Sequence, residues 1–402
     1  MKLKYCILPL LTVLYCHTIT AQEANEYITR GKALTDRALY SQAISLYTEG
    51  MNKHEDYRLL VGRGEAYLIS GQTGAAIKDF SAANGLVSGS GYHGLARAYI
   101  TENDFEKAVS CLRHHLESEF KIPRRDILTD PAFAKLENTD EWRQLWNTDW
   151  YTRLDEAVSE VEYYIRTGKI ADGEAVLSEV ENIYSEKPEI MYLKGLIESA
   201  RNNTSESIQY LAEAVNTDNP DYAVWKLYID LLDRNGDNLR AANECDNALS
   251  WYPEQTELIY LKAENLRRAN DREKAMEVSM QYLDLYPDGE LANRQAGLIA
   301  GDLGEYTRAL NYFSKNIENY PGKAQCFTDR ADIYLKIKSY DAAIYDYSMA
   351  LDLWPRDSEA YYRKGLALIN TGNKEEACHD FKMALRFGNK KASAMISKHC
   401  IR

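Results

Sequence analysis

The chain has 402 residues and a formal net charge of −13, and 45% of its residues are hydrophobic while 27% are charged. This composition is typical of folded globular proteins, and it excludes disordered, collagen-like and disulfide-dense classes. The acidic balance also argues against a nucleic-acid partner, because phosphates attract basic surfaces.

The first 21 residues have the features of an export signal. Lys2 and Lys4 make a basic start, residues 6–16 are mostly apolar, and Ala21 is a small residue before the expected cut. The apolar stretch is too short to span a bilayer, and no later segment qualifies, so no transmembrane segment is expected. We therefore predict a periplasmic or secreted protein cut after Ala21.

Cys16 raises the alternative of a lipoprotein. A bacterial lipid-attachment box places a small residue before its cysteine, whereas Tyr15 is bulky. This disfavours lipidation. After cleavage five widely spaced cysteines remain, an odd number that implies no disulfide framework, and most of them are expected to act as small core residues. They are Cys111, Cys245, Cys326, Cys378 and Cys400.

Small residues and prolines recur at every 34th position over the second half of the chain. The first ladder consists of Ala241, Ala275, Ala309, Ala343 and Ala377. Twelve residues before each of these runs a second ladder, namely Ile229, Ala263, Gly297, Ala331 and Gly365, with Gly195 one period earlier. A third ladder consists of Pro253, Pro287, Pro321 and Pro355.

A 34-residue period with these features resembles the tetratricopeptide repeat, a helix–turn–helix unit. Small residues let two antiparallel helices cross closely, and an aromatic such as Tyr347, four residues after Ala343, packs on the same face. The proline ends the second helix. One helix pair cannot bury its apolar face alone, so the repeats stack. The predicted fold is all-α, an alpha-alpha superhelix with two helical-repeat arrays joined by a short helical insert.

The same spacing of twelve appears more loosely near the N-terminus, in Gly31 with Ala43, Gly64 with Ala76, and Ala96 with Ala108. We predict an N-terminal array of about three repeats over residues 22–118 and a helical joint over 119–151. A C-terminal array of about seven repeats follows over 152–388, with a degenerate first unit, and a closing helix over 389–402.

The joint is expected to hold two short helices. Asp130-Pro131 is predicted to cap a helix running through Leu136, and Asp140 to cap a second one. The second helix would carry Trp142, Trp146 and Trp150 on one stripe. Such a stripe could be a binding platform, but we interpret it as a core stripe that seals the first array.

Three motifs suggest chemistry that their context does not support. Residues 89–94 match GxGxxG but join two helix pairs, without the strand that a dinucleotide site needs. Residues 233–244 have calcium-loop spacing, yet Asn238 stands where the loop needs glycine. Histidine and cysteine neighbours at 111–115, 378–379 and 399–400 lie where helices pack. No metal site, no cofactor and no catalytic site is predicted.

The resemblance implies that the first helix of each repeat lines a concave groove. Candidate groove residues are Tyr192, Lys226, Tyr260, Arg267, Arg268, Arg294 and Tyr362. Aromatic and arginine side chains are frequent anchors in interfaces, and the basic members favour a protein or peptide partner with an acidic segment. The alternative is that these charges only pair with neighbours such as Glu264. Lys226 is followed by Asp230 where a carboxylate clamp of this family would need Asn, so a terminal carboxylate is not predicted as the ligand.

Two functions agree with these features. The first is a non-catalytic, exported scaffold that binds proteins or peptides through its groove. The alternative is a substrate-capture component, binding glycans or peptides, of an outer-membrane uptake or envelope machine. It would carry stacked, exposed aromatic rings and a membrane tether.

Overall fold

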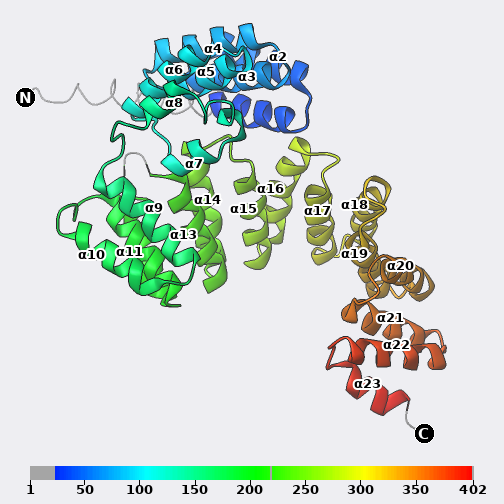
Figure 1. The fold of residues 1–402 in the computed structure, drawn as a ribbon. Helices are drawn as coiled ribbons and strands as arrows, with labels where there is room; N and C mark the ends of the chain where they lie inside the picture. The colour runs from blue at the N-terminus through cyan, green and yellow to red at the C-terminus, as the bar shows by residue number, and fades with distance from the viewer. Residues whose placement is uncertain (1–22, 218–219, 401–402) are drawn as a thin grey trace, which may run out of the picture. The chain divides into compact units, whose positions relative to one another are not determined.

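The computed structural model describes residues 23–217 and 220–400, and every regular element in these residues is a helix (Figure 1). The all-α prediction is therefore confirmed. The predicted signal peptide lies outside the described residues. The chain forms two compact units, unit 1 over residues 1–258 and unit 2 over residues 259–402.

In the described part of unit 1, residues 23–36 are the first that are helical. Its further helices are α2 (Tyr40–Lys53), α3 (Tyr57–Ile69), α4 (Thr73–Leu86), α5 (Tyr92–Thr101), α6 (Phe105–Glu117), α7 (Arg124–Thr129), the 3-10 helix η1 (Pro131–Phe133), α8 (Asp140–Leu145), α9 (Arg153–Arg166), α10 (Ile170–Glu181), α11 (Pro188–Ala200), α12 (Thr204–Ala214), α13 (Tyr222–Asn235) and α14 (Asn238–Trp251).

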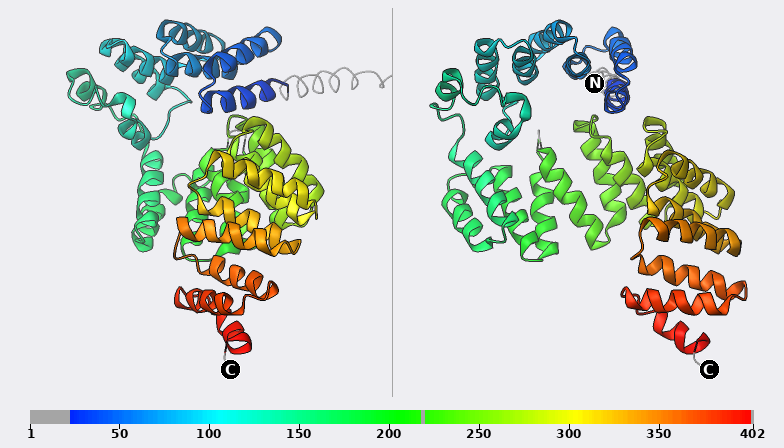
Figure 2. Two further views of the ribbon diagram at one scale, coloured as in Figure 1. Left: turned by 90° about the vertical axis from the view of Figure 1, so that its right-hand side faces the viewer. Right: turned by 45° about the vertical axis from the view of Figure 1, so that its right-hand side comes forward.

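Unit 2 continues the alternation of first and second helices, visible as successive hairpins in Figure 2. Its elements are α15 (Glu257–Arg268, which begins at the unit boundary), α16 (Arg272–Leu285), α17 (Glu290–Asp302), α18 (Tyr306–Asn319), α19 (Ala324–Lys336), α20 (Tyr340–Leu353), α21 (Ser358–Asn370), α22 (Lys374–Arg386) and α23 (Ala392–His399).

The small residues of the repeat lie at the helix crossings, against the aromatic ring of the second helix. A Cβ built on Gly297 would lie 2.5 Å from Cε1 of Phe313, and one on Gly365 would lie 2.6 Å from Cε1 of Phe381. Both rings are fully buried. These glycines therefore leave the space that the ring fills, as the spacing of twelve predicts.

A further 34-residue ladder marks the turn between the two helices of each repeat. Seven residues at this spacing have a left-handed backbone with φ between 63° and 84°, and four of them are glycines. They are Gly168, Asn202, Gly236, Asn270, Gly304, Lys338 and Gly372. Glycine and asparagine tolerate this conformation best. This ladder is hard to recognise in the sequence because glycine occupies only some of its positions.

The joint differs from its prediction in detail. Asp130 caps only the three-residue η1, by accepting from the Ala132 amide at 2.8 Å. Thr139, not Asp140, caps α8, which ends before Trp146. An unpredicted helix, α7, precedes both.

The interpretation of the tryptophans as core residues is confirmed. Trp142 is buried, while Trp146 and Trp150 are partly buried against the same cluster, which includes Phe133 and Leu136. Arg124 and Arg113 lie over the Trp146 and Trp150 rings, at 5.1 and 5.7 Å from their centroids.

One cysteine pair departs from the expectation. Cys378 of α22 and Cys400, the residue after α23, form a disulfide with 5.6 Å between their Cα atoms. The linear spacing could not show this pair, because it forms only when α23 turns back along α22. Cys111, Cys245 and Cys326 are buried free thiols, as expected. None of the described helices is long and apolar enough to cross a membrane.

Candidate functional site

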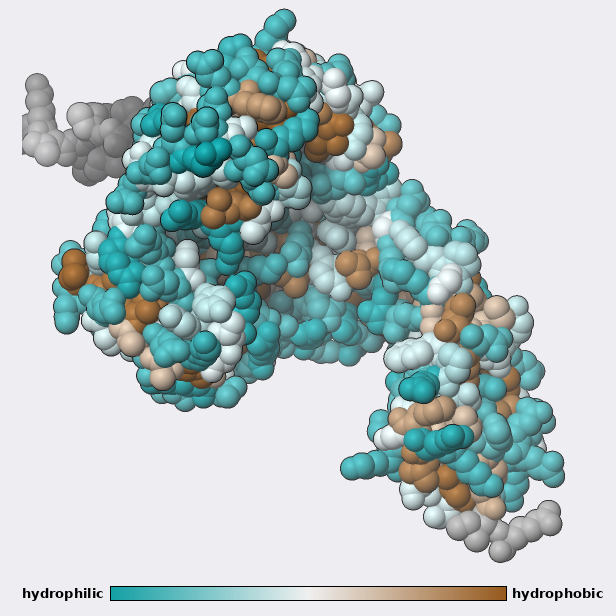
Figure 3. All heavy atoms as spheres, viewed as in Figure 1, coloured by the Kyte–Doolittle hydropathy of each residue, from teal (hydrophilic) through white to brown (hydrophobic). Residues whose placement is uncertain are grey.

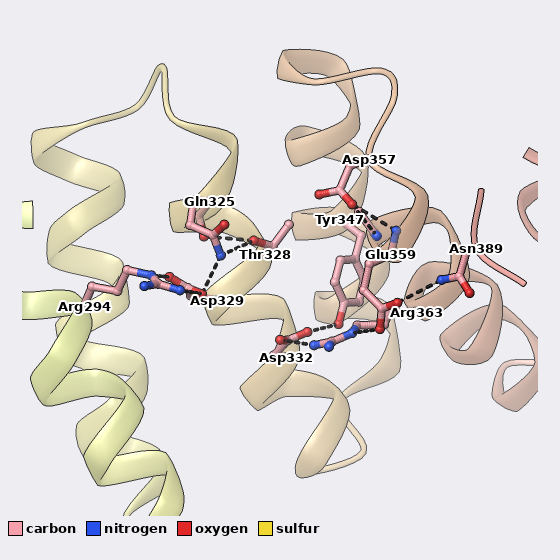
Figure 4. Close-up of polar contacts among 11 residues, drawn as sticks. Arg294, Gln325, Thr328, Asp329, Asp332, Tyr347, Asp357, Glu359, Arg363 and Asn389 are labelled. Carbon is pink, nitrogen blue, oxygen red and sulfur yellow. Dashed lines mark hydrogen bonds and ion pairs between the residues drawn. The ribbon is translucent and has the colours of Figure 1, made fainter. Parts of the chain in front are cut away.

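Ion pairs join neighbouring first helices of unit 2. Arg294 of α17 donates to Asp329 of α19 at 2.7 Å, and Arg363 of α21 reaches back to Asp332 of α19 (Figure 4). We use the name first-helix surface for a set of side chains of α15, α17, α19 and α21 that lie at or beside these ion pairs. It consists of Tyr260, Glu264, Arg267, Arg268, Leu291, Arg294, Leu298, Asp302, Gln325, Thr328, Asp329, Asp332, Glu359, Tyr362, Arg363 and Leu366.

The same pattern begins on α15. Arg267 donates to Glu264 on its own helix at 2.7 Å and to Asp302 of α17 at 2.9 Å. These bonds raise the pKa of Arg267 above its ordinary value. In contrast, burial raises the pKa of Asp329 although Arg294 opposes it. The arginines of this surface are thus held by carboxylates of the chain itself.

This pairing leaves Arg267 and Arg294 only partly exposed. Their side chains retain 25% and 32% exposure. Arg268 is more exposed, at 46%, and also donates to Glu264, at 3.1 Å. Neighbouring carboxylates reach these arginines because the first helices, one repeat apart in sequence, lie side by side.

The predicted tyrosines differ in their surroundings. Tyr192 is buried, and its hydroxyl donates to Glu162 at 2.9 Å, so its ring is not offered to a partner. Tyr260 and Tyr362 are partly buried, with ring contacts to Tyr282 at 5.6 Å and to Phe381 at 6.0 Å.

The predicted residues therefore fall into two groups. Tyr260, Arg267, Arg268, Arg294 and Tyr362 belong to unit 2. Tyr192 and Lys226 belong to unit 1. Lys226 is exposed and lies 3.7 Å from Glu257.

The apolar part of the first-helix surface was not predicted from the sequence. Leu291 is 51% exposed, and Leu298 and Leu366 are partly exposed. Leu298 and Leu366 stand in the register of Glu264 and Asp332, at steps of one repeat. That register could have identified them. Figure 3 shows apolar and polar residues interspersed over α20–α22.

The other motifs take ordinary structural places. Asn235 donates to Asp237 at 2.8 Å within the turn between α13 and α14, where calcium-loop spacing was noted. The GxGxxG segment leads into α5. Among the described residues no three His, Cys, Asp or Glu side chains are grouped so that they could hold a metal ion.

Comparison with known families agrees with the repeat pattern. Models of the tetratricopeptide repeat match residues 90–121, 294–358 and 328–392. Together with the helix pairs and the 34-residue ladders, these matches define a helical-repeat protein. The chain contains tetratricopeptide repeats over the matched residues.

Sequence relatives share only short stretches with this chain. Serine/threonine-protein phosphatase T of Aspergillus oryzae is 32% identical over 82 residues, which are 20% of this chain and 17% of the relative. The heat shock protein sti1 homolog of Schizosaccharomyces pombe is 26% identical over 147 residues, or 37% and 25% of the two chains. The chain thus spans a quarter or less of these relatives.

A solved tetratricopeptide repeat protein from Parabacteroides merdae is also similar. It is 18% identical with a TM-score of 0.49, and the match covers 61% of this chain and 98% of that one.

Proposed function

We propose that the protein is an exported, non-catalytic scaffold that holds a protein or peptide segment on the first-helix surface of unit 2. The observation that carries this proposal is the alternation of leucines with partly exposed arginines, such as Leu291 and Arg294 on α17. Apolar side chains beside polar, hydrogen-bonding groups suit a segment of mixed character.

An acidic segment is the partner that the arginines favour. Because Arg294 is bound by Asp329 and Arg267 by Asp302, a carboxylate of the partner has to replace an internal one. Such an exchange between charged pairs gives specificity and faster association at low salt more than it gives affinity.

Export is supported by two independent features. One is the basic, apolar and small-residue order of residues 1–21. The other is the Cys378–Cys400 disulfide, since disulfides persist in oxidising compartments such as the bacterial periplasm. Measuring the intact mass of the protein from its native host tests this: a chain that retains Met1 would contradict cleavage.

Partner binding is tested by crosslinking pull-down from the host envelope. Reversing Arg294 alone would place a carboxylate against Asp329, so we suggest the exchanged pair Arg294→Asp with Asp329→Arg. This pair keeps one positive and one negative charge while inverting their order. Arg143→Glu, at an exposed site in the joint, is the matched control.

We expect the exchanged pair to lose most of the captured partner while keeping the helical content, and the control to capture it normally. Capture of the same partner at full yield by the folded exchanged pair would overturn the assignment of this surface.

The substrate-capture alternative is less well supported. It calls for exposed rings that stack together. The most exposed rings of this region are Tyr345, within α20, and Trp354, directly after α20, with 63% and 55% exposure. They are nine residues apart, and this spacing places two side chains on roughly opposite sides of a helix. They therefore do not make one platform.

A further inference from the structure

We propose that the Cys378–Cys400 disulfide is a redox-controlled cross-link that keeps α23 packed against the last helix pair. Through Asn389, it also stabilises the end of the first-helix surface. The first part of this inference stands on the contacts of α23. The second concerns regulation of the proposed binding surface and rests on that proposal.

α23 closes the apolar end of the array. Ala392 is fully buried, and Met395 and Ile396 are partly buried against the cluster that contains Leu368 and Phe381. The helix has only eight residues and no side-chain cap at its start. Helices of this length are unstable alone in water, so its position depends on what fastens it.

α23 is held at both ends, by side-chain hydrogen bonds before its first residue and by the disulfide after its last. At its start, the Asn389 side chain donates to Glu359 Oε2 at 2.8 Å and accepts from the Lys391 amide at 3.1 Å. At its end, Cys400 is bonded to Cys378 of α22, closing a loop across 22 residues. Such a cross-link removes many open conformations and favours the closed one.

The start of α23 is continuous with the first-helix surface. Glu359, which accepts from Asn389, also accepts from Arg363 at 2.8 Å, and Arg363 pairs with Asp332 (Figure 4). Release of α23 therefore removes one of the two side-chain partners of Glu359 in this chain of contacts. Reduction of the two cysteines is thus expected to change the contacts of Glu359 on the first-helix surface, although neither cysteine contacts Glu359.

The other three cysteines are more buried than Cys378 and Cys400, so thiol–disulfide exchange is expected to be selective for this pair. Burial raises the pKa of both Cys111 and Cys326 to about 11, and Cys245 is fully buried. Buried thiols with little thiolate exchange slowly. Cys378 and Cys400 are both partly accessible.

The reaction is a thiol–disulfide exchange. Cys378 and Cys400 lose two electrons and two protons as their sulfur–sulfur bond forms, and a partner disulfide is reduced to two thiols. Glutathione disulfide serves as the oxidant in the test. A dithiol reductant reverses the reaction, with the electrons returning to the two cysteines.

The test uses the full chain, oxidised with glutathione disulfide or reduced with dithiothreitol. Alkylation followed by peptide mapping assigns the cysteines. In the oxidised protein we expect a cross-linked pair of peptides containing residues 378 and 400, with Cys111, Cys245 and Cys326 as thiols. Alkylation of both Cys378 and Cys400 in the oxidised protein would overturn the proposal.

Amide hydrogen exchange then measures the protection of α23 in the oxidised and reduced protein. We expect exchange over residues 392–400 to accelerate by about 10²-fold on reduction, and equally in the Cys378→Ser, Cys400→Ser double variant. Cys326→Ser is the control and should leave that segment protected when oxidised. Unchanged protection of residues 392–400 after reduction would show that packing alone holds α23, and would contradict the proposal.

A separate variant tests the coupling between α23 and the first-helix surface. Asn389→Ala, with the disulfide intact, should accelerate exchange in the first turns of α21 as reduction does. Protection of α21 that is indifferent to both changes would contradict the coupling. None of these measurements requires a partner, so their failure is distinguishable from failure of the proposed function.

Discussion

The helix pairs α3/α4 in unit 1 and α19/α20 in unit 2 contain the same clamp. Arg63 donates to Asp79 at 2.7 and 2.8 Å, and Arg330 donates to Asp346 at the same two distances. Each arginine also reaches back to a hydroxyl of the preceding second helix, Thr48 in the first case and Ser314 in the second. One register of the repeat therefore produces one buried polar arrangement in both units.

The two pairs differ at the ring beside the clamp. Unit 1 has Phe80, whereas unit 2 has Tyr347, whose hydroxyl donates to Asp332 of the first-helix surface. Asp332 also pairs with Arg363. In unit 2 the core is thus connected to the proposed binding surface, while Phe80 has no group to make such a connection.

The largest effect is expected from breaking the clamp. Asp346→Ala leaves Arg330 mostly buried without its partner, and we expect a loss of about 3–5 kcal/mol of stability. Asp79→Ala should act in the same direction on unit 1. Urea denaturation followed by circular dichroism measures both losses.

A double replacement separates the clamp from its packing. Arg330→Met with Asp346→Leu fills the site with apolar groups and should recover most of the loss, because no charge is left unpaired. If the single and double variants are equally unstable, side-chain volume rather than charge dominates the site.

Acidification is expected to change the stability of the two units differently. In unit 1, burial lowers the pKa of His93 and His115 to about 4, and their rings lie 5.3 Å apart beside Arg97 and Asp130. The unfolded chain takes up these protons near pH 6.5, before the native state does. Unit 1 should therefore lose roughly 2–4 kcal/mol as the pH falls from about 6.5 to 4.

Unit 2 should lose less stability than unit 1 over this pH range. Burial raises the pKa of Asp329 and Asp380, so their native forms take up protons before the unfolded forms do, and acidification relieves a cost. Hydrogen exchange at pH 7 and pH 5 measures the two units separately. His115→Leu should remove much of the acid sensitivity of unit 1, whereas His114→Gln, at an exposed position, should not. Equal acid responses in both units would contradict the prediction.

Glycine at the ring gives a smaller, steric comparison. A Cβ on Gly64 would lie 2.7 Å from Cε1 of Phe80, so Gly64→Ala should cost about 1–3 kcal/mol through overpacking. Ala331 already occupies this register beside Tyr347, and Ala331→Gly should cost only about 1 kcal/mol through helix propensity. Thermal melts of both variants measure this. A Gly64→Ala variant as stable as the unmodified protein would indicate that Phe80 can move aside.

Much of this arrangement could be predicted from the sequence, because the repeat reports packing at fixed spacing. The ladders through Ala343 and Ala331 predicted the crossings correctly, since small residues are needed wherever backbones approach. The clamp was equally visible in principle: Arg63-Gly64 and Arg330-Ala331 precede Asp79-Phe80 and Asp346-Tyr347 by the same interval.

The partners of surface charges could not be predicted in the same way. Arg294 was predicted as a groove residue, but its partner Asp329, which lies 35 residues away on the next first helix, was not predicted. Cys378 and Cys400 meet only through the return of α23. Both contacts depend on how neighbouring elements are placed in space, which a periodic pattern within one helix does not record.

The smallest effect is expected at the ring itself. Tyr347→Phe removes the hydroxyl that Asp332 accepts and makes unit 2 resemble unit 1, at a cost of about 1 kcal/mol. The reciprocal Phe80→Tyr meets Glu65, which stands in the register of Asp332 but already accepts from Arg97 at 2.8 Å through both oxygens. We therefore expect no gain in stability from Phe80→Tyr. Urea midpoints of the two variants measure this, and a stabilised Phe80→Tyr would mean that the connection between core and surface is available to both units and is not particular to unit 2.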